Sequence, residues 1–208
     1  MKNNVNEFRI RARINKEVLY KNLHIYEGTE TFKNCEAVFS QLSDIISSME
    51  IKLAYIFTDY FPLKLEENVD KYIICYVSAE RDTNSLASDL ISRGEYLKGY
   101  LLNEMVSHAI FKASDKMNNK IRNDIKKQGY KLNRRYAPGD GNLDLKYQRK
   151  FIEELEKHIR VEIYSNEHNV MVPSNSLTYI YTIVEGVDEE INTCFDCINT
   201  DCVYKNTE

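Results

Sequence analysis

The segment around Pro138 combines residue types that could seat a small charged molecule. Paired cations, Arg134 and Arg135, run into Pro138, which has no amide donor, and into Gly139 and Gly141, which accept positive φ and leave room beside the main chain. Guanidinium groups, open backbone amides and the start of a following helix together favour an anionic or zwitterionic ligand. A surface turn between a strand and a helix is the alternative interpretation of the same residues.

A cluster of cysteines near the C-terminus is the second group that could do chemistry, and its members are Cys194, Cys197 and Cys202. Three thiolates can hold an iron–sulfur cluster with an open site, or zinc when a fourth ligand such as His158 or His168 completes the set. Free surface thiols are the alternative. Cys35 and Cys75 stand singly in apolar segments, so we expect them to be buried thiols rather than ligands.

The loop arginines need a strand before them and a helix behind them, and the sequence pattern predicts both. Residues 130–136 are typical of a strand, and Asp144 can cap a helix that ends near residue 157 or 158. Apolar steps of three and four residues predict helices over 31–49, 83–91 and 95–127, with Gly129 ending the last of them. The remaining predicted elements are a short helix over 14–20 and strands over 52–57, 71–77, 161–163 and 176–184.

These elements predict an α+β fold, with several strands and segregated helices. We expect a single domain over residues 1–190, built on a central, mostly antiparallel, twisted sheet, and then a cysteine-bearing tail over residues 191–208. The chain of 208 residues, 43% of them hydrophobic, is long enough to bury one substantial core.

The overall charge gives no general electrostatic case for nucleic acid or an anionic membrane as a partner. The chain carries 28 basic and 32 acidic residues, for a formal net charge of -4. No apolar run approaches the roughly 20 residues that span a bilayer. The first residues also lack the apolar stretch of a signal peptide, so we expect a cytoplasmic protein.

Several of these segments, in their order and spacing, resemble a known family. The loop has arginine, three residues and glycine at Arg135 and Gly139, and Gln148 follows in the next predicted helix. The run from Met171 to Ser176 is similar to a Met-hydrophobic-Pro-x-x-Ser segment, and the cysteine tail is similar as well. The family is the activation (reactivation) domain of vitamin-B12-dependent methionine synthase, in its small free-standing form.

The resemblance implies an accessory activation protein. Such a domain binds S-adenosylmethionine and supports reductive methylation of cobalamin on a separate methionine synthase or other corrinoid protein, with an electron-transfer protein as a possible further partner. It implies that Arg135 holds the methionine end of the ligand, a use suited to planar donors facing a carboxylate. Glu104 could face the ligand's ammonium group, or be a solvated helix position. The implied ligand-binding residues are Arg135, Tyr136, Ala137, Pro138, Gly139, Asp140 and Glu104.

The chain also departs from the family pattern. Asp140 stands where the loop of the family has a tyrosine, and Asn175 stands where the family commonly has a lysine. No Asp-x-His-x-x-Gly segment is present, so any corrinoid must arrive on a partner. Tyr136 is the aromatic residue nearest to the loop, and its ring could face the positive sulfonium of the ligand. The alternative is that Tyr136 is a half-buried strand residue. The alternative function is a non-enzymatic binding module whose cysteine tail binds metal or docks a partner.

Overall fold

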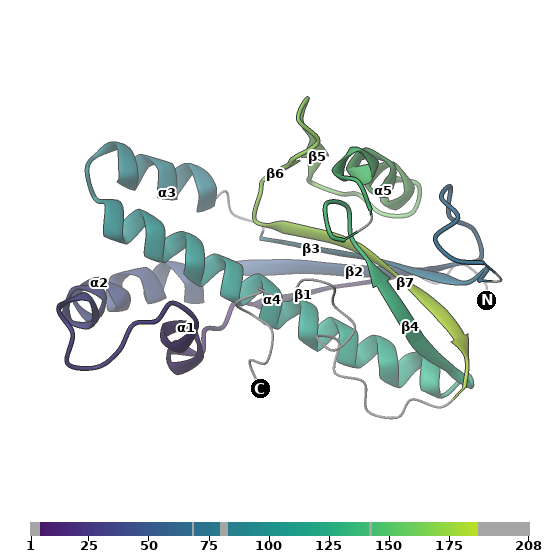
Figure 1. Cartoon of the computed structure of the whole chain (residues 1–208), viewed down its shortest axis with the longest axis horizontal. Coiled ribbons are helices and arrows are strands. Elements are labelled where there is room, and N and C mark those ends of the chain that lie inside the picture. Colours follow the sequence, from purple (N-terminus) through teal and green to yellow (C-terminus); the bar gives the residue numbers. More distant parts are fainter. Residues whose placement is uncertain (1–4, 68, 80–82, 142, 187–208) are drawn as a thin grey trace.

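Five strands form one sheet in which every neighbouring pair is antiparallel (Figure 1). The computed structural model describes residues 5–67, 69–79, 83–141 and 143–186. The strand order is β1-β2-β3-β7-β4, so β1 and β4 are the two edges. The strands span Val5–Arg11 (β1), Glu50–Thr58 (β2), Tyr72–Ala79 (β3), Tyr130–Tyr136 (β4) and Ser176–Glu185 (β7).

The helices cover both faces of this sheet. They span Lys16–Asn22 (α1), Glu30–Ser47 (α2), Thr83–Ser92 (α3), Tyr96–Lys126 (α4) and Gln148–Glu156 (α5), with a short 3-10 turn at Leu145–Tyr147 (η1) before α5. Helices α1, α2 and α4 lie on one face and α5 lies on the other. A small hairpin pairs Tyr164–Ser165 (β5) with Met171–Val172 (β6). The predicted α+β single domain with an antiparallel sheet is therefore confirmed.

Strand β3 is buried on both sides and separates two cores. Ile73, Cys75 and Val77 pack into a large core with α1, α2 and α4, whereas Ile74 and Tyr76 pack into a smaller core with α5. This alternation follows from the period of two along a strand, and it explains why β3 has a near-continuous apolar sequence. Figure 1 shows α5 and the β5–β6 hairpin apart from the long α4, which lies along the sheet.

Helix α4 is the longest element, and an apolar stripe explains its length. Its 31 residues extend about 46 Å at 1.5 Å per residue. The stripe recurs at three- and four-residue steps and faces the sheet and its neighbouring helices. Its buried apolar members are Leu101, Leu102, Met105, Val106, Ala109, Ile110, Ala113, Met117, Ile121 and Ile125.

The chain turns from α4 into β4 where the sequence predicts. Gly129 adopts φ +79°, a conformation that favours glycine, and its carbonyl accepts the amide of Gly186 at 2.9 Å. The predicted strand over residues 130–136 is confirmed as β4. Among the described residues, no helix combines the length and apolar character needed to cross a membrane.

Three sequence predictions differ from the structure. Strand β1 was not predicted, although the alternation of charged and apolar residues from Glu7 to Arg11 is typical of a half-buried edge strand. The predicted strand over 161–163 is wrong, since the next strand begins at Tyr164. The helix predicted from Asp144 is interrupted: Asp144 caps the 3-10 turn, and α5 itself ends at Glu156.

Candidate functional site

A β-bulge in β4 sets the direction of the loop arginine. Leu132 lies opposite Ile183 and Arg135 lies opposite Tyr181, so two residues of β4 face the single residue Thr182. The hydroxyl of Thr182 accepts the amide hydrogen of Arg134 at 3.0 Å, which replaces a regular ladder bond. It also lies 3.1 Å from Oε1 of Glu66. Thr182 therefore holds the extra residue in place.

The bulge places Arg135 on the α4 side of the sheet. In a regular strand Leu132 and Arg135, three residues apart, would point to opposite faces. Instead the Arg135 guanidinium lies 4.4 Å from the centre of the Tyr179 ring, in the large core to which Leu132 also belongs. Planar stacking of this kind orients the guanidinium, whose planar donors suit planar acceptors such as carboxylates.

Tyr136 points to the opposite face from Arg135. Its hydroxyl donates to Oε1 of Glu66 at 2.6 Å, and the Arg134 guanidinium lies 5.2 Å from its ring. Burial and the bond to Glu66 raise the pKa of Tyr136 to about 12. The structure therefore separates Arg135 and Tyr136, which the sequence treats as neighbours in one site.

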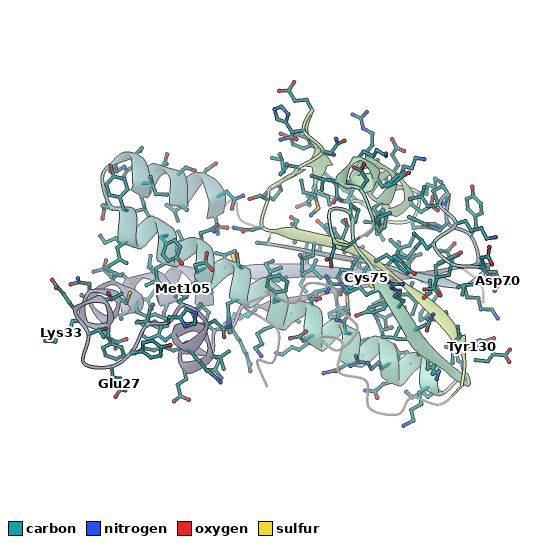
Figure 2. All side chains as sticks on the ribbon, in the orientation of Figure 1. Glu27, Lys33, Asp70, Cys75, Met105 and Tyr130 are labelled. Atoms are coloured by element: carbon teal, nitrogen blue, oxygen red, sulfur yellow. The ribbon has the colours of Figure 1, made fainter. Side chains whose placement is uncertain are left out.

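Beneath Arg135 lies a buried polar network. The hydroxyl of Tyr179 donates to Oδ1 of Asn118 at 2.9 Å and is bonded to Oγ of Ser114 at 2.8 Å. Burial raises the pKa of Tyr179 far above its ordinary value, and it also raises the pKa of the Cys75 thiol. Figure 2 shows Cys75 within the sheet. Cys75 and Cys35 are both buried, as predicted.

Helix α4 adds charged residues next to this network. Asp115 and Arg122 are seven residues apart, so they lie on one side of the helix, about 10 Å apart along its axis. Reduced hydration raises the pKa of the Asp115 carboxyl, although Lys112, Arg135 and Arg122 act to lower it. Asp115, Arg122 and Tyr181 were not predicted as site residues. The seven-residue spacing of Asp115 and Arg122 was the available signal on α4, and no local pattern connects it with Tyr181 of β7.

The loop after β4 is a tight turn. The amide of Asp140 donates to the carbonyl of Ala137 at 3.0 Å, with Pro138 and Gly139 at the two central positions. Gly139 has φ +85°, as a type II turn requires, and a Cβ there would lie 3.1 Å from Cδ1 of Leu145. The amide of Gly139 donates to the carbonyl of Leu143 at 2.8 Å. The expectation of open amides is therefore wrong at Gly139 and Asp140.

The backbone amide at the start of the helix behind the loop is also hydrogen-bonded within the protein. Oδ1 of Asp144 accepts the amide of Lys146 at 2.9 Å, and this bond holds the pKa of the Asp144 carboxyl below its ordinary value. Gln148, which is buried, donates from Nε2 to Oγ1 of Thr178 at 2.6 Å. The backbone groups of the loop and of the helix start are thus used within the protein, and both segments shape the edge of the sheet beside Arg135.

Glu104 lies well along α4 from the Arg135 region. It precedes Asp115 by eleven residues, which is about 16 Å along the helix axis. In Figure 2, Met105, the next residue, lies far from Cys75. Glu104 is half-buried, and burial raises the pKa of its carboxyl. Its charge also raises the pKa of Tyr100, although burial contributes more to that shift.

The segment before β7 links the sheet to α3. Asn175 donates from Nδ2 to Oγ1 of Thr83 at 2.9 Å, and Asn84 contacts both Asn175 and Ser174. Oγ of Ser176 lies 2.8 Å from Oγ of Ser78 across the strand pair. Asn175, which stands where the family commonly has lysine, is used here to connect structural elements.

The predicted metal ligands Cys194, Cys197 and Cys202 lie outside the described residues. Within the part of the chain that the structure describes, no group of three histidine, cysteine or acidic side chains is arranged to hold a metal ion. His158 lies 3.8 Å from Glu154, and His168 lies 3.5 Å from Glu167.

Comparison with known proteins gives a structural likeness only. No family model matches the chain, and no curated protein matches its sequence. Among solved structures, the chain is similar to a crystal structure of the MetH reactivation domain bound to AdoHcy, with a TM-score of 0.61 and 11% sequence identity. The match covers 91% of this chain and 80% of that chain. The chain therefore has the fold of that reactivation domain.

Proposed function

We propose that the protein is an accessory activation protein that binds S-adenosylmethionine. It would support the reductive methylation of cobalamin carried by a separate methionine synthase or other corrinoid protein. The observation that carries this proposal is Arg135, which follows the family's loop pattern and is turned by the β4 bulge onto the ring of Tyr179. The similar solved domain is bound to AdoHcy, the product that S-adenosylmethionine leaves after methyl transfer.

In this proposal Arg135 binds the carboxylate of the ligand's methionine end. A guanidinium stacked on an aromatic ring keeps its orientation and loses little side-chain entropy on binding. Ala137, Pro138, Gly139 and Asp140 form the turn that borders the ligand, and the small Gly139 keeps that border close to Leu145. Glu104 remains a candidate partner of the ammonium group. Tyr136, whose hydroxyl donates to Glu66 on the opposite face of the sheet, is given no ligand contact in this proposal.

The chain would act by binding and orienting, because the methyl acceptor is held by the partner. The partner's corrinoid would first gain one electron from an electron-transfer protein and would then accept the methyl group as its bond to the sulfonium breaks, which leaves S-adenosylhomocysteine. Asp140, in place of the loop tyrosine, removes an aromatic contact near the ligand and adds a carboxylate that would attract the positive sulfonium.

Calorimetry with S-adenosylmethionine and S-adenosylhomocysteine tests the proposal. We expect Arg135→Ala to weaken binding at least tenfold, because it removes a charge-assisted bond to the carboxylate. Arg134→Ala is the matched control, since Arg134 has the same charge but stacks on Tyr136 at the opposite face. The absence of heat with the unaltered chain at millimolar ligand would reject the proposal, as would equal losses for the two variants.

The second candidate function is a non-enzymatic binding module with a metal-binding or partner-docking cysteine tail. Asp140 favours it, because the loop lacks the tyrosine of the family pattern. Anaerobic purification separates the two. A brown protein with charge-transfer absorbance supports a redox role for Cys194, Cys197 and Cys202, whereas a colourless, zinc-loaded protein supports the module.

A further inference from the structure

Two tyrosines of β7, Tyr179 and Tyr181, share one face and one environment but differ in hydrogen bonding. Both are almost fully buried, and their rings meet edge to face with centroids 5.7 Å apart. The hydroxyl of Tyr179 is satisfied by Ser114 and Asn118. The hydroxyl of Tyr181 is closed off from solvent and has no hydrogen-bond partner within residues 5–186 as described. Such a group costs stability unless something binds it.

Charged residues of both signs surround this hydroxyl. Arg135 is the register partner of Tyr181 on the neighbouring strand. Arg122 of α4 donates from Nη1 to Oδ1 of Asn119 at 3.1 Å, and its buried Nε has no partner in the described ranges. Burial raises the pKa of Tyr181 most, the two guanidinium groups lower it, and Asp115 raises it. Tyr181 and Arg135 are therefore paired across β7 and β4, and the charges of Arg122 and Asp115 on α4 act on the same hydroxyl.

The Arg122 side chain extends along α4 toward Asp115. Helical side chains point back toward the N-terminus of their helix, and the bond to Asn119 shows that Arg122 does so. Its guanidinium thus lies near residue 119, which is four residues, or about 6 Å along the axis, from Asp115. Asp115 keeps contact with solvent, so it can still receive a ligand group.

Donors and an acceptor at this spacing fit a zwitterion. Two guanidinium groups and a phenol hydroxyl all donate, which suits a carboxylate, and the Asp115 carboxylate accepts, which suits an ammonium group. An amino-acid group carries both charges one carbon apart. A simple anion such as phosphate would meet the repulsion of Asp115.

We propose that Tyr181, Arg122 and Asp115 complete, with Arg135, a receptor for the amino-acid end of the ligand. Tyr181 and Arg122 donate to the ligand carboxylate beside Arg135, and Asp115 accepts from the ammonium group. This inference rests on the proposed function, and it assigns the ammonium partner to Asp115 rather than to Glu104.

The test compares two thioethers by calorimetry: S-adenosylhomocysteine, and 5′-methylthioadenosine, which lacks the amino-acid group. We expect Tyr181→Phe and Asp115→Asn each to weaken S-adenosylhomocysteine binding about tenfold, and to leave 5′-methylthioadenosine binding unchanged. Glu153→Gln, an exposed carboxylate of α5 on the other side of the sheet, is the control for loss of charge.

Thermal unfolding separates a binding role from a structural one. Because the Tyr181 hydroxyl is unsatisfied, Tyr181→Phe should leave the unfolding midpoint unchanged or raise it. Tyr179→Phe, the matched variant two residues away, should lower the midpoint, since it breaks two buried bonds. A lowered midpoint for Tyr181→Phe together with equal losses for both thioethers would overturn the inference.

Other outcomes distinguish this inference from the proposed function. If Arg135→Ala weakens binding but Tyr181→Phe and Asp115→Asn do not, the receptor is wrong and the function stands. If Glu104→Gln weakens binding and Asp115→Asn does not, the ammonium assignment is overturned. A crystal structure of the complex with only an internal water on Tyr181 would also overturn it. If the unaltered chain binds neither thioether nor S-adenosylmethionine, the proposed function itself fails.

Discussion

Thr182, the residue of β7 that lies opposite the β4 bulge, offers the sharpest test of how the fold positions Arg135. Its hydroxyl accepts the amide of Arg134 at 3.0 Å and lies close to Glu66 and Asn133. Thr182→Val replaces that hydroxyl with a methyl group of nearly the same size, so packing changes little. The variant leaves the Arg134 amide without its acceptor at the one place where the β4 register shifts.

The expected loss follows from the groups left unpaired. An unsatisfied, partly buried donor costs about 1–3 kcal/mol, so we expect the free energy of unfolding to fall by about 2 kcal/mol. In a chain of this size that corresponds to a fall of about 4–8 °C in Tm. If β4 instead relaxes to a regular ladder, the side chains beyond Leu132 exchange faces, and Arg135 leaves Tyr179.

Urea unfolding and calorimetry with S-adenosylhomocysteine would measure both consequences. We expect Thr182→Val to lose stability and to weaken binding at least tenfold, if the proposed function holds. Thr182→Ser keeps the hydroxyl and should retain binding. A valine variant that unfolds within about 0.5 kcal/mol of the natural chain would refute the bulge argument, since surface-like changes fall in that range.

Three further predictions follow from buried groups and from the loop. Burial and the charge of Lys112 lower the pKa of His108 to about 4, and His108 accepts the amide of Asn15 at Nε2. A histidine in the unfolded chain titrates near pH 6.5, so the free energy of unfolding should be highest above that pH. It should fall by about 2 kcal/mol by pH 5 and continue to fall down to pH 4. Urea unfolding across this range should show the loss, and the His108→Gln variant should lack most of this pH dependence. Gly139→Ala should destabilise the chain by about 1–2 kcal/mol, because φ is +85° and the new Cβ would meet Leu145; an unchanged unfolding midpoint would contradict this. The Cys75 thiol is fully buried with a raised pKa, so it should resist a thiol reagent in the folded protein and react after unfolding in urea.

The sequence alone determined the elements whose signals are local. Residues 130–136 have the β-propensity of a strand, Gly129 ends the helix before it, and Pro138 with Gly139 specifies the turn after it. The apolar stripe of α4 and the continuous apolar run of β3 likewise predict a helix on a sheet. These features depend on neighbours within a few residues, so they can be recognised without the rest of the chain.

Only the tertiary structure decided which side chains share a site. The β4 bulge depends on Thr182, which lies far away in the sequence, and it turns Arg135 to the face opposite Tyr136. The same long-range packing pairs Tyr181 of β7 with Arg135 and places α4, which carries Asp115, against β4. The period of two along a strand determines only that successive side chains point to opposite faces of the sheet. Which face each residue takes depends on register, and register is set by contacts between distant segments.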